Sequence, residues 1–187
     1  MSLDPARLEP ETARPLKRRE YERLVELGAF DDERIELLYG VLITMSPHGA
    51  PHDSAIQQLT SLLVRALHPR AVVRIQSAFA ASDDSEPEPD VAVVPPGEYH
   101  VEHPSRAHLI VEVAKSSLAK DRGIKAGLYA QCGVPEYWVI NVVDRLIEVH
   151  TQIVRGAYTR VIPYARGESV KLLEFPDVEV AVSEILL

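Results

Sequence analysis

Apolar residues recur every three or four positions in three segments of the chain, a spacing typical of helices with one buried face. The first helix is predicted over residues 12–28, with Thr12 as its cap and Gly28 as its end. The second helix carries the apolar stripe from Ile56 to Leu67, and the third is predicted over residues 118–132. Each stripe is most simply explained as a contact with the core.

Shorter apolar runs, bounded mainly by glycine, proline and polar residues, predict strands. The predicted strands span residues 34–39, 41–45, 72–80, 91–94, 109–114, 137–143, 146–150 and 158–162. The first two flank Gly40, and residues 46–53 after them form a loop. This order predicts an α/β (α+β) fold, with a mixed β-sheet flanked by helices and an N-terminal helix and β-hairpin.

The composition is that of a soluble globular domain, since 46% of the 187 residues are hydrophobic and 26% are charged. We therefore expect one domain over residues 1–187, with its core between about residues 30 and 165. The single cysteine, Cys132, excludes an intramolecular disulfide and a cysteine-based zinc site. Because the N-terminus has no apolar signal core and no run reaches membrane-spanning length, we expect a cytoplasmic protein without a membrane partner.

The charge balance limits the class of function. The 20 Lys and Arg residues against 28 Asp and Glu residues give a net charge of −8, whereas a generic DNA-binding protein is basic. An enzyme acting on nucleic acid is still allowed, because divalent metal ions and a local basic patch offset the repulsion between carboxylates and phosphate.

Two carboxylates adjoin predicted apolar strands. Glu112 lies within the run 109–114, which is apolar on both faces, so it needs a cation, a metal ion, a hydrogen-bond donor or an upward-shifted pKa. Asp90 opens the run 91–94, and if the two strands are neighbours both acids could share one Mg²⁺. Two alternatives stay open: a surface pair of Glu112 with Lys115, and a solvated Asp90.

A lysine in the third predicted helix is a candidate catalytic group. Asp121 and Lys125 lie four residues apart on one helical face, with Tyr129 one turn further along. An ordinary ion pair explains the same spacing and stabilises a helix by only about 0.2–0.5 kcal/mol. Because the helix follows the Glu112 strand, packing back over that strand would direct the Lys125 ammonium at an attacking water.

His48 and His52 suggest a metal site that their sequence context disfavours. The glycine and proline between them argue against presentation of both imidazoles on one helical face, so we expect no zinc site there. His52 begins the second helix and could contribute singly to a polar site. Cys132 lies at a helix C-terminus, where no dipole activates a thiolate, and is interpreted as a packed residue.

Several spaced motifs, in one order, resemble a known bacterial family. They are Pro89-Asp90, Val111-Glu112-Val113, Ser116-Ser117-Leu118, Asp121-Arg122 with Lys125, Leu128-Tyr129-Ala130 and Gly133-Val134-Pro135-Glu136-Tyr137-Trp138. The family is the Uma-type restriction endonuclease family, formerly a domain of unknown function, within the PD-(D/E)XK nuclease superfamily. The resemblance spans about residues 20–185 and implies a restriction-endonuclease-like core.

The resemblance also implies roles for particular residues. Asp90 and Glu112 would bind Mg²⁺ or Mn²⁺, together with the backbone carbonyl of Val113, and Lys125 would be the catalytic lysine displaced onto the helix. The superfamily more often has this lysine two residues after the acid, where this chain has Ala114. The auxiliary site residues would be Glu36, His52 and Asp121.

By this resemblance the protein is a metal-dependent endonuclease whose partner is nucleic acid, with DNA as the expected substrate. A homodimer is expected, because two symmetric active sites most easily cut two strands. Two other classes of function remain: a catalytically silent binding or regulatory module with the nuclease fold, and a structural protein in which these charged groups form a buried ion network.

Overall fold

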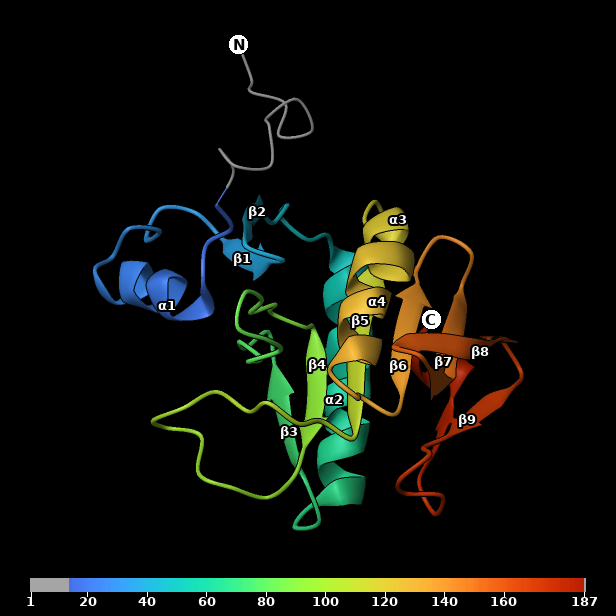
Figure 1. The fold of residues 1–187 in the computed structure, drawn as a ribbon. Coiled ribbons are helices and arrows are strands. Elements are labelled where there is room, and N and C mark those ends of the chain that lie inside the picture. The colour runs from blue at the N-terminus through green and yellow to red at the C-terminus, as the bar shows by residue number, and fades with distance from the viewer. Residues whose placement is uncertain (1–13, 187) are drawn as a thin grey trace.

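A six-stranded mixed sheet forms the centre of the computed structural model, which describes residues 14–186 (Figure 1). Its strands, in spatial and chain order, are β3 (Val72–Ile75), β4 (Val91–Val94), β5 (Leu109–Ala114), β6 (Tyr137–Asn141), β7 (Leu146–Val154) and β8 (Ala157–Ala165). Only β5 and β6 pair in parallel within this sheet, and the helical segment between them is the crossover. The mixed sheet flanked by helices confirms the predicted fold class.

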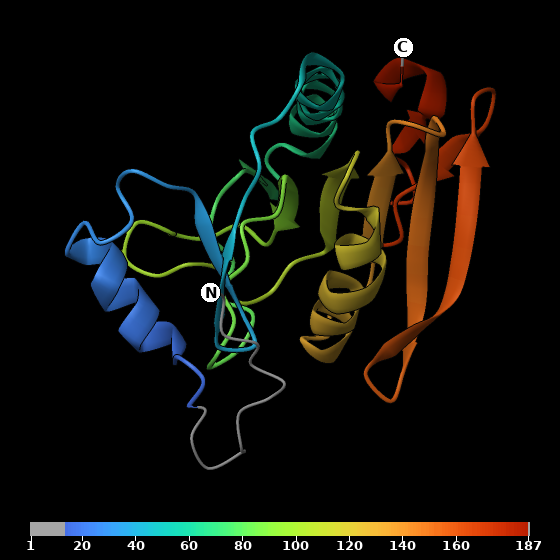
Figure 2. The same cartoon turned by 90° about the horizontal axis from the view of Figure 1, so that it is seen from above.

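Helices cover both faces of this sheet (Figure 2). One face packs against α2 (Ala50–Leu67) and α5 (Val182–Ile185), and the opposite face packs against the crossover. The crossover consists of α3 (Leu118–Lys120), a π-helical turn η2 (Asp121–Lys125) and α4 (Ala126–Gln131). Alternate β5 residues therefore enter different cores, since side chains along a strand point to opposite faces.

The N-terminal elements form a separate layer beside β3 and β4 (Figure 1). They are α1 (Arg18–Glu26), β1 (Ile35–Leu38) and β2 (Val41–Thr44). The hairpin turn requires Gly40, because its φ is +76° and a Cβ there would lie 2.3 Å from a carbon of Pro15. The predicted cap Thr12 lies outside the described residues, and the first helix begins at Arg18 instead.

Several predicted strand ends are wrong: β6 ends at Asn141 instead of residue 143, β7 continues to Val154 instead of residue 150, and β8 spans Ala157–Ala165 instead of residues 158–162. Two further boundaries are wrong for identifiable reasons. The loop predicted over residues 46–53 ends early, because α2 already begins at Ala50 and holds Pro51 in its first turn, where the missing N–H costs nothing. The strand predicted over residues 72–80 ends at Ile75, because Gln76 adopts φ +43°, which an extended strand does not allow.

The C-terminal elements were not predicted from the sequence. They are β9 (Ser169–Lys171), β10 (Glu179–Ala181) and α5. Val170, Val180 and Ile185 are buried in the same core cluster as α2, so the observed core extends past residue 165. Within residues 14–186, no helix combines the length and apolarity needed to cross a membrane.

Candidate active site

A cavity of about 320 Å³ lies at one end of the sheet, lined by the β2–α2 connection and by the residues that lead into α3. Its walls come from β2, the start of α2, the start of β4, the end of β5 and the crossover helix. Asp90, Glu112, Asp121 and Lys125 all line it, together with His52. Five of the residues singled out in the sequence therefore meet in one place.

Strand register brings Asp90 and Glu112 together. The antiparallel β4–β5 pairing sets Val91 opposite Val111, so its continuation sets Asp90 opposite Glu112 on the same face. The Val113 backbone N–H donates to Asp90 Oδ2 at 2.7 Å, which fixes that carboxylate against β5. Both acids are nearly inaccessible to solvent, with 7% and 5% of their surface exposed. The predicted strand neighbours are confirmed, and neither acid is solvated.

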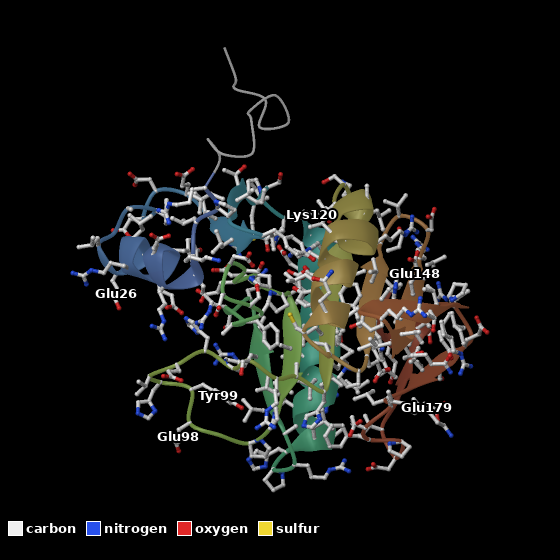
Figure 3. The ribbon with its side chains drawn as sticks, viewed as in Figure 1. Glu26, Glu98, Tyr99, Lys120, Glu148 and Glu179 are labelled. Atoms are coloured by element: carbon white, nitrogen blue, oxygen red, sulfur yellow. The ribbon has the colours of Figure 1, made fainter. Side chains whose placement is uncertain are left out.

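Lys125 joins two buried carboxylates. Its Nζ lies 2.9 Å from Glu112 Oε1 and 2.9 Å from Oε2 of Glu36, which is fully buried on β1. Lys120 Nζ donates to the other oxygen of Glu36 at 2.8 Å, and Figure 3 shows Lys120 between α3 and the β1–β2 hairpin. The partner of Glu112 is thus Lys125, whereas Lys115 is exposed at the cavity wall.

The lysine sits on a π-helical turn, which the sequence periodicity does not reveal. The Ala126 N–H reaches back five residues to the Asp121 carbonyl, which also accepts a hydrogen bond from Tyr137 Oη at 3.1 Å. Asp121 and Lys125 are both buried on this turn, and Lys125 pairs with Glu112 and Glu36 instead of Asp121. Single π turns inside α-helices are frequent at functional sites.

Tyr129 is a site residue whose contact the sequence analysis missed. Its hydroxyl, fully buried on α4, donates to Glu112 Oε1 at 2.7 Å, the same oxygen that accepts from Lys125. Among residues 14–186, no hydrogen bond occupies Glu112 Oε2. The only signal in the sequence was the spacing of four residues between Lys125 and Tyr129. This arrangement leaves Oε2 free for a cation in the cavity.

The titration behaviour follows from an excess of buried acids. Burial raises the pKa of Glu112 to about 8, and the neighbouring acids outnumber the one lysine that opposes this rise. Burial also acts to raise the pKa of Glu36, but Lys125 and Lys120 together hold it below its usual value. Burial alone would lower the pKa of Lys125, yet Glu112 and Glu36 raise it, so Lys125 stays a cation.

A divalent cation fits this set of donors. If all four acids are ionised, the cluster carries a formal excess of two negative charges. The acids are Glu36, Asp90, Glu112 and Asp121, and the cations are Lys120 and Lys125. Carboxylate and carbonyl oxygens are the ligands that Mg²⁺ and Mn²⁺ prefer. Such an ion would remove the electrostatic reason for the raised pKa of Glu112.

The structure brings His48 and His52 together, contrary to the expectation from their spacing. His48 precedes α2, yet its ring stacks on His52 with centroids 3.8 Å apart. His52 Nε2 lies 3.3 Å from Asp90 Oδ2. Burial disfavours the charged forms of His52 and Asp90. Their mutual contact nevertheless raises the pKa of His52 and holds the pKa of Asp90 below its usual value. The argument against one helical face holds, because His48 lies in the loop before α2, but that argument does not cover a pair formed by a loop and a helix.

Gln76 was also missed, and it adjoins both groups. Its side-chain amide lies 3.2 Å from His48 Nδ1 and 3.5 Å from Asp90 Oδ1. The left-handed φ of +43° that ends β3 is the conformation from which Gln76 makes these contacts. Non-glycine residues with such backbone strain are concentrated at functional sites.

Comparison with known proteins agrees with this geometry. The family model described as "Uma2: Putative restriction endonuclease" matches residues 18–183. The chain belongs to this family. A search of curated proteins found no match.

A solved structure supports the Uma2 assignment at the level of the fold. It is described as "a putative nuclease belonging to DUF820 from Anabaena variabilis ATCC 29413". The alignment covers 92% of this chain and 98% of that one, with 15% sequence identity and a TM-score of 0.72. Family and fold together support a nuclease.

Proposed function

We propose that this Uma2 protein is a metal-dependent endonuclease that hydrolyses phosphodiester bonds in DNA. One observation carries the proposal: Asp90 and Glu112 face each other across adjacent strands at a cavity, with Lys125 bonded to Glu112. A phosphodiester needs its developing charge offset and a water activated beside it, and these groups suit both tasks.

Each residue has a part in this mechanism. Asp90, Glu112 Oε2 and the Val113 carbonyl would hold Mg²⁺ or Mn²⁺, which lowers the pKa of a nearby water and offsets charge on the phosphate. Lys125 would orient that water and stabilise the pentacovalent transition state. Glu36 would hold Lys125 in place through a second ion pair, and Lys115 and Lys120 would supply positive charge for the DNA backbone.

The experiment is cleavage of supercoiled plasmid and of labelled single-stranded oligonucleotide, with Mg²⁺, Mn²⁺ or EDTA. Glu112→Ala and Lys125→Ala are expected to lower turnover of the folded protein by about 10²–10⁴-fold. Lys171→Ala is the matched control, because this exposed lysine lies on β9, outside the cavity. Cleavage equal in all variants would identify a contaminant and remove the assignment.

A buried ion network is the competing interpretation, because Lys125 already bonds two carboxylates. Removing Lys125 then costs about 3–5 kcal/mol of stability by leaving buried acids unpaired. A silent module would bind nucleic acid or protein without cleaving it under any metal. Activity per folded molecule separates these alternatives from the nuclease. A homodimer with two such sites remains part of the proposal, testable by light scattering.

A further inference from the structure

A second group of candidate metal-binding atoms adjoins Asp90. It consists of His48, His52 and Asp90, which each offer a ligand atom within 4.8 Å of the others. The three come from separate elements: the loop before α2, the first turn of α2 and the start of β4. Their convergence is therefore a product of the fold.

The best-placed pair already has the spacing of two ligands on one ion. His52 Nε2 and Asp90 Oδ2 are 3.3 Å apart. Nitrogen and oxygen ligands that each lie about 2.1 Å from an ion are separated from each other by roughly 3.0–3.4 Å. An ion could thus replace the hydrogen bond between these atoms without moving either side chain far.

Asp53 and Gln76 contact the candidate ligands and would hold them in position. Asp53 Oδ1 lies 3.4 Å from His52 Nδ1, and a carboxylate behind an imidazole is a common support for a metal-bound histidine. Gln76 contacts both His48 and Asp90. His52 Nδ1 is buried without a well-formed hydrogen bond. An ion bound to Nε2 would fix the orientation of the imidazole ring and so stabilise this side chain.

The His48 ring must turn before it can take part. Stacked imidazoles direct their lone pairs along nearly parallel planes, and the two rings here differ by only 27°. His48 is only partly buried and lies outside the helix, so rotation of its side chain would break its stacking on His52 and its contact with Gln76 but would not move the helix. The adjoining cavity of about 320 Å³ leaves room for water or a phosphate oxygen as a further ligand.

We propose that His48, His52 and Asp90 form a site for a transition-metal ion of the Mn²⁺, Co²⁺ or Zn²⁺ class. Imidazole nitrogen suits these ions, whereas Mg²⁺ prefers oxygen ligands and gains little from two histidines. The site shares Asp90 with the carboxylate pair, so it would set which metal the cavity retains. Any catalytic part for this ion rests on the proposed function, but its binding does not.

The test is Co²⁺ binding to the full-length protein after removal of metals with EDTA and then of the EDTA. Calorimetry gives the affinity, and visible absorption reports nitrogen ligands. His48→Ala and His52→Ala are each expected to weaken Co²⁺ binding by at least about tenfold and to change Mg²⁺ binding much less, because Mg²⁺ gains little from imidazole ligands. His100→Ala, which alters an exposed histidine outside the cavity, is expected to match the unmodified protein.

Equal Co²⁺ affinity in the unmodified protein and both histidine variants overturns the site, as does an unmodified protein that binds no Co²⁺. His48→Gln replaces the alanine variant if circular dichroism shows that the latter is misfolded. Cleavage is measured separately on the same samples. Cleavage without histidine-dependent binding removes only this inference, whereas histidine-dependent binding without cleavage under any metal removes only the proposed function.

Discussion

The two faces of β5 have different tasks. Val111 and Val113 point into the apolar core beneath α2, where they meet other aliphatic side chains. Glu112, between them, points to the crossover helix, where Lys125 and Tyr129 both contact one of its oxygens. Both faces of the strand pack, but only Glu112 adds a buried charged group at the candidate site, so the valines and Glu112 can be altered separately.

The valines and Glu112 differ in the free energy of burying their side chains. Burial of the valines is favourable by itself, since apolar area leaves water. Burial of Glu112 is unfavourable and is offset only by specific donors and, on our proposal, by a bound cation. Substitution of the valines is therefore expected to change stability, and substitution of Glu112 mainly activity and metal binding, whereas Ile110 and Ala114 on the Glu112 face are themselves packed in a core.

Glu112→Gln is expected to give the largest separation of the two effects. It keeps the shape of the side chain and removes an anionic metal ligand, so cleavage by folded protein should fall by at least about 10³-fold, or about 4 kcal/mol of transition-state stabilisation. Thermal unfolding in EDTA at pH 7 should change little, because the raised pKa already keeps most of Glu112 protonated. Plasmid cleavage and calorimetry measure both.

A variant that lost stability and activity together would contradict the division between the faces. It would indicate that Glu112 matters through its contacts with Lys125 and Tyr129 alone, as a structural ion network requires.

Leu63→Ala is the complementary change on the apolar face. Leu63 is fully buried on α2, and its truncation should lower the free energy of unfolding by about 2–5 kcal/mol. The cavity contains no part of this side chain, so turnover per folded molecule and the metal concentration for half-maximal rate should stay unchanged. Urea unfolding with parallel cleavage assays tests this, and a shifted metal requirement would show that the faces are coupled.

The sequence predicted the elements that carry local periodicity. The spans of β4 and β5 were correct at both ends, because each is a continuous apolar run between turn residues. The C-terminal end of β3 and the start of α2 were wrong, since they depend on the backbone of Gln76 and on Pro51 fitting a first helical turn. The short β9 and β10 lack a periodic signal of their own.

The site was predictable only as far as residue type and chain order allow. Asp90, Glu112 and Lys125 were singled out, and the structure places them together. The Glu36–Lys125 contact joins residues 89 positions apart and has no local signal. The stacking of His48 on His52 depends on a loop conformation that spacing cannot specify.

Two tyrosine variants test whether the contact between Tyr129 and Glu112 affects metal binding. Tyr129→Phe removes one of two donors to Glu112, whereas Tyr137→Phe removes an equally buried hydroxyl that bonds the Asp121 carbonyl. Each should cost about 0.5–1.5 kcal/mol of stability. Only Tyr129→Phe frees Glu112 to turn, so it alone should raise the Mn²⁺ concentration for half-maximal binding, by roughly three- to tenfold. Equal shifts in calorimetric titrations would make Tyr129 merely structural.

The last comparison is the pH dependence of stability in EDTA. Folding raises the pKa of Glu112 from 4.5 to about 8, so between these values the folded state holds a proton that the unfolded state has lost. Stability from this group is complete below pH 4.5 and declines as pH rises toward 8. Because burial also raises the pKa of Glu86 to about 8, the informative quantity is the difference between the unmodified protein and Glu112→Gln. Relative to the variant, the Tm of the unmodified protein should fall as the pH rises from 5 to 8, and Mn²⁺ should abolish the trend. A difference that is flat with pH in EDTA would mean that Lys125 alone neutralises Glu112, leaving no excess charge on this face of β5 for a metal to offset.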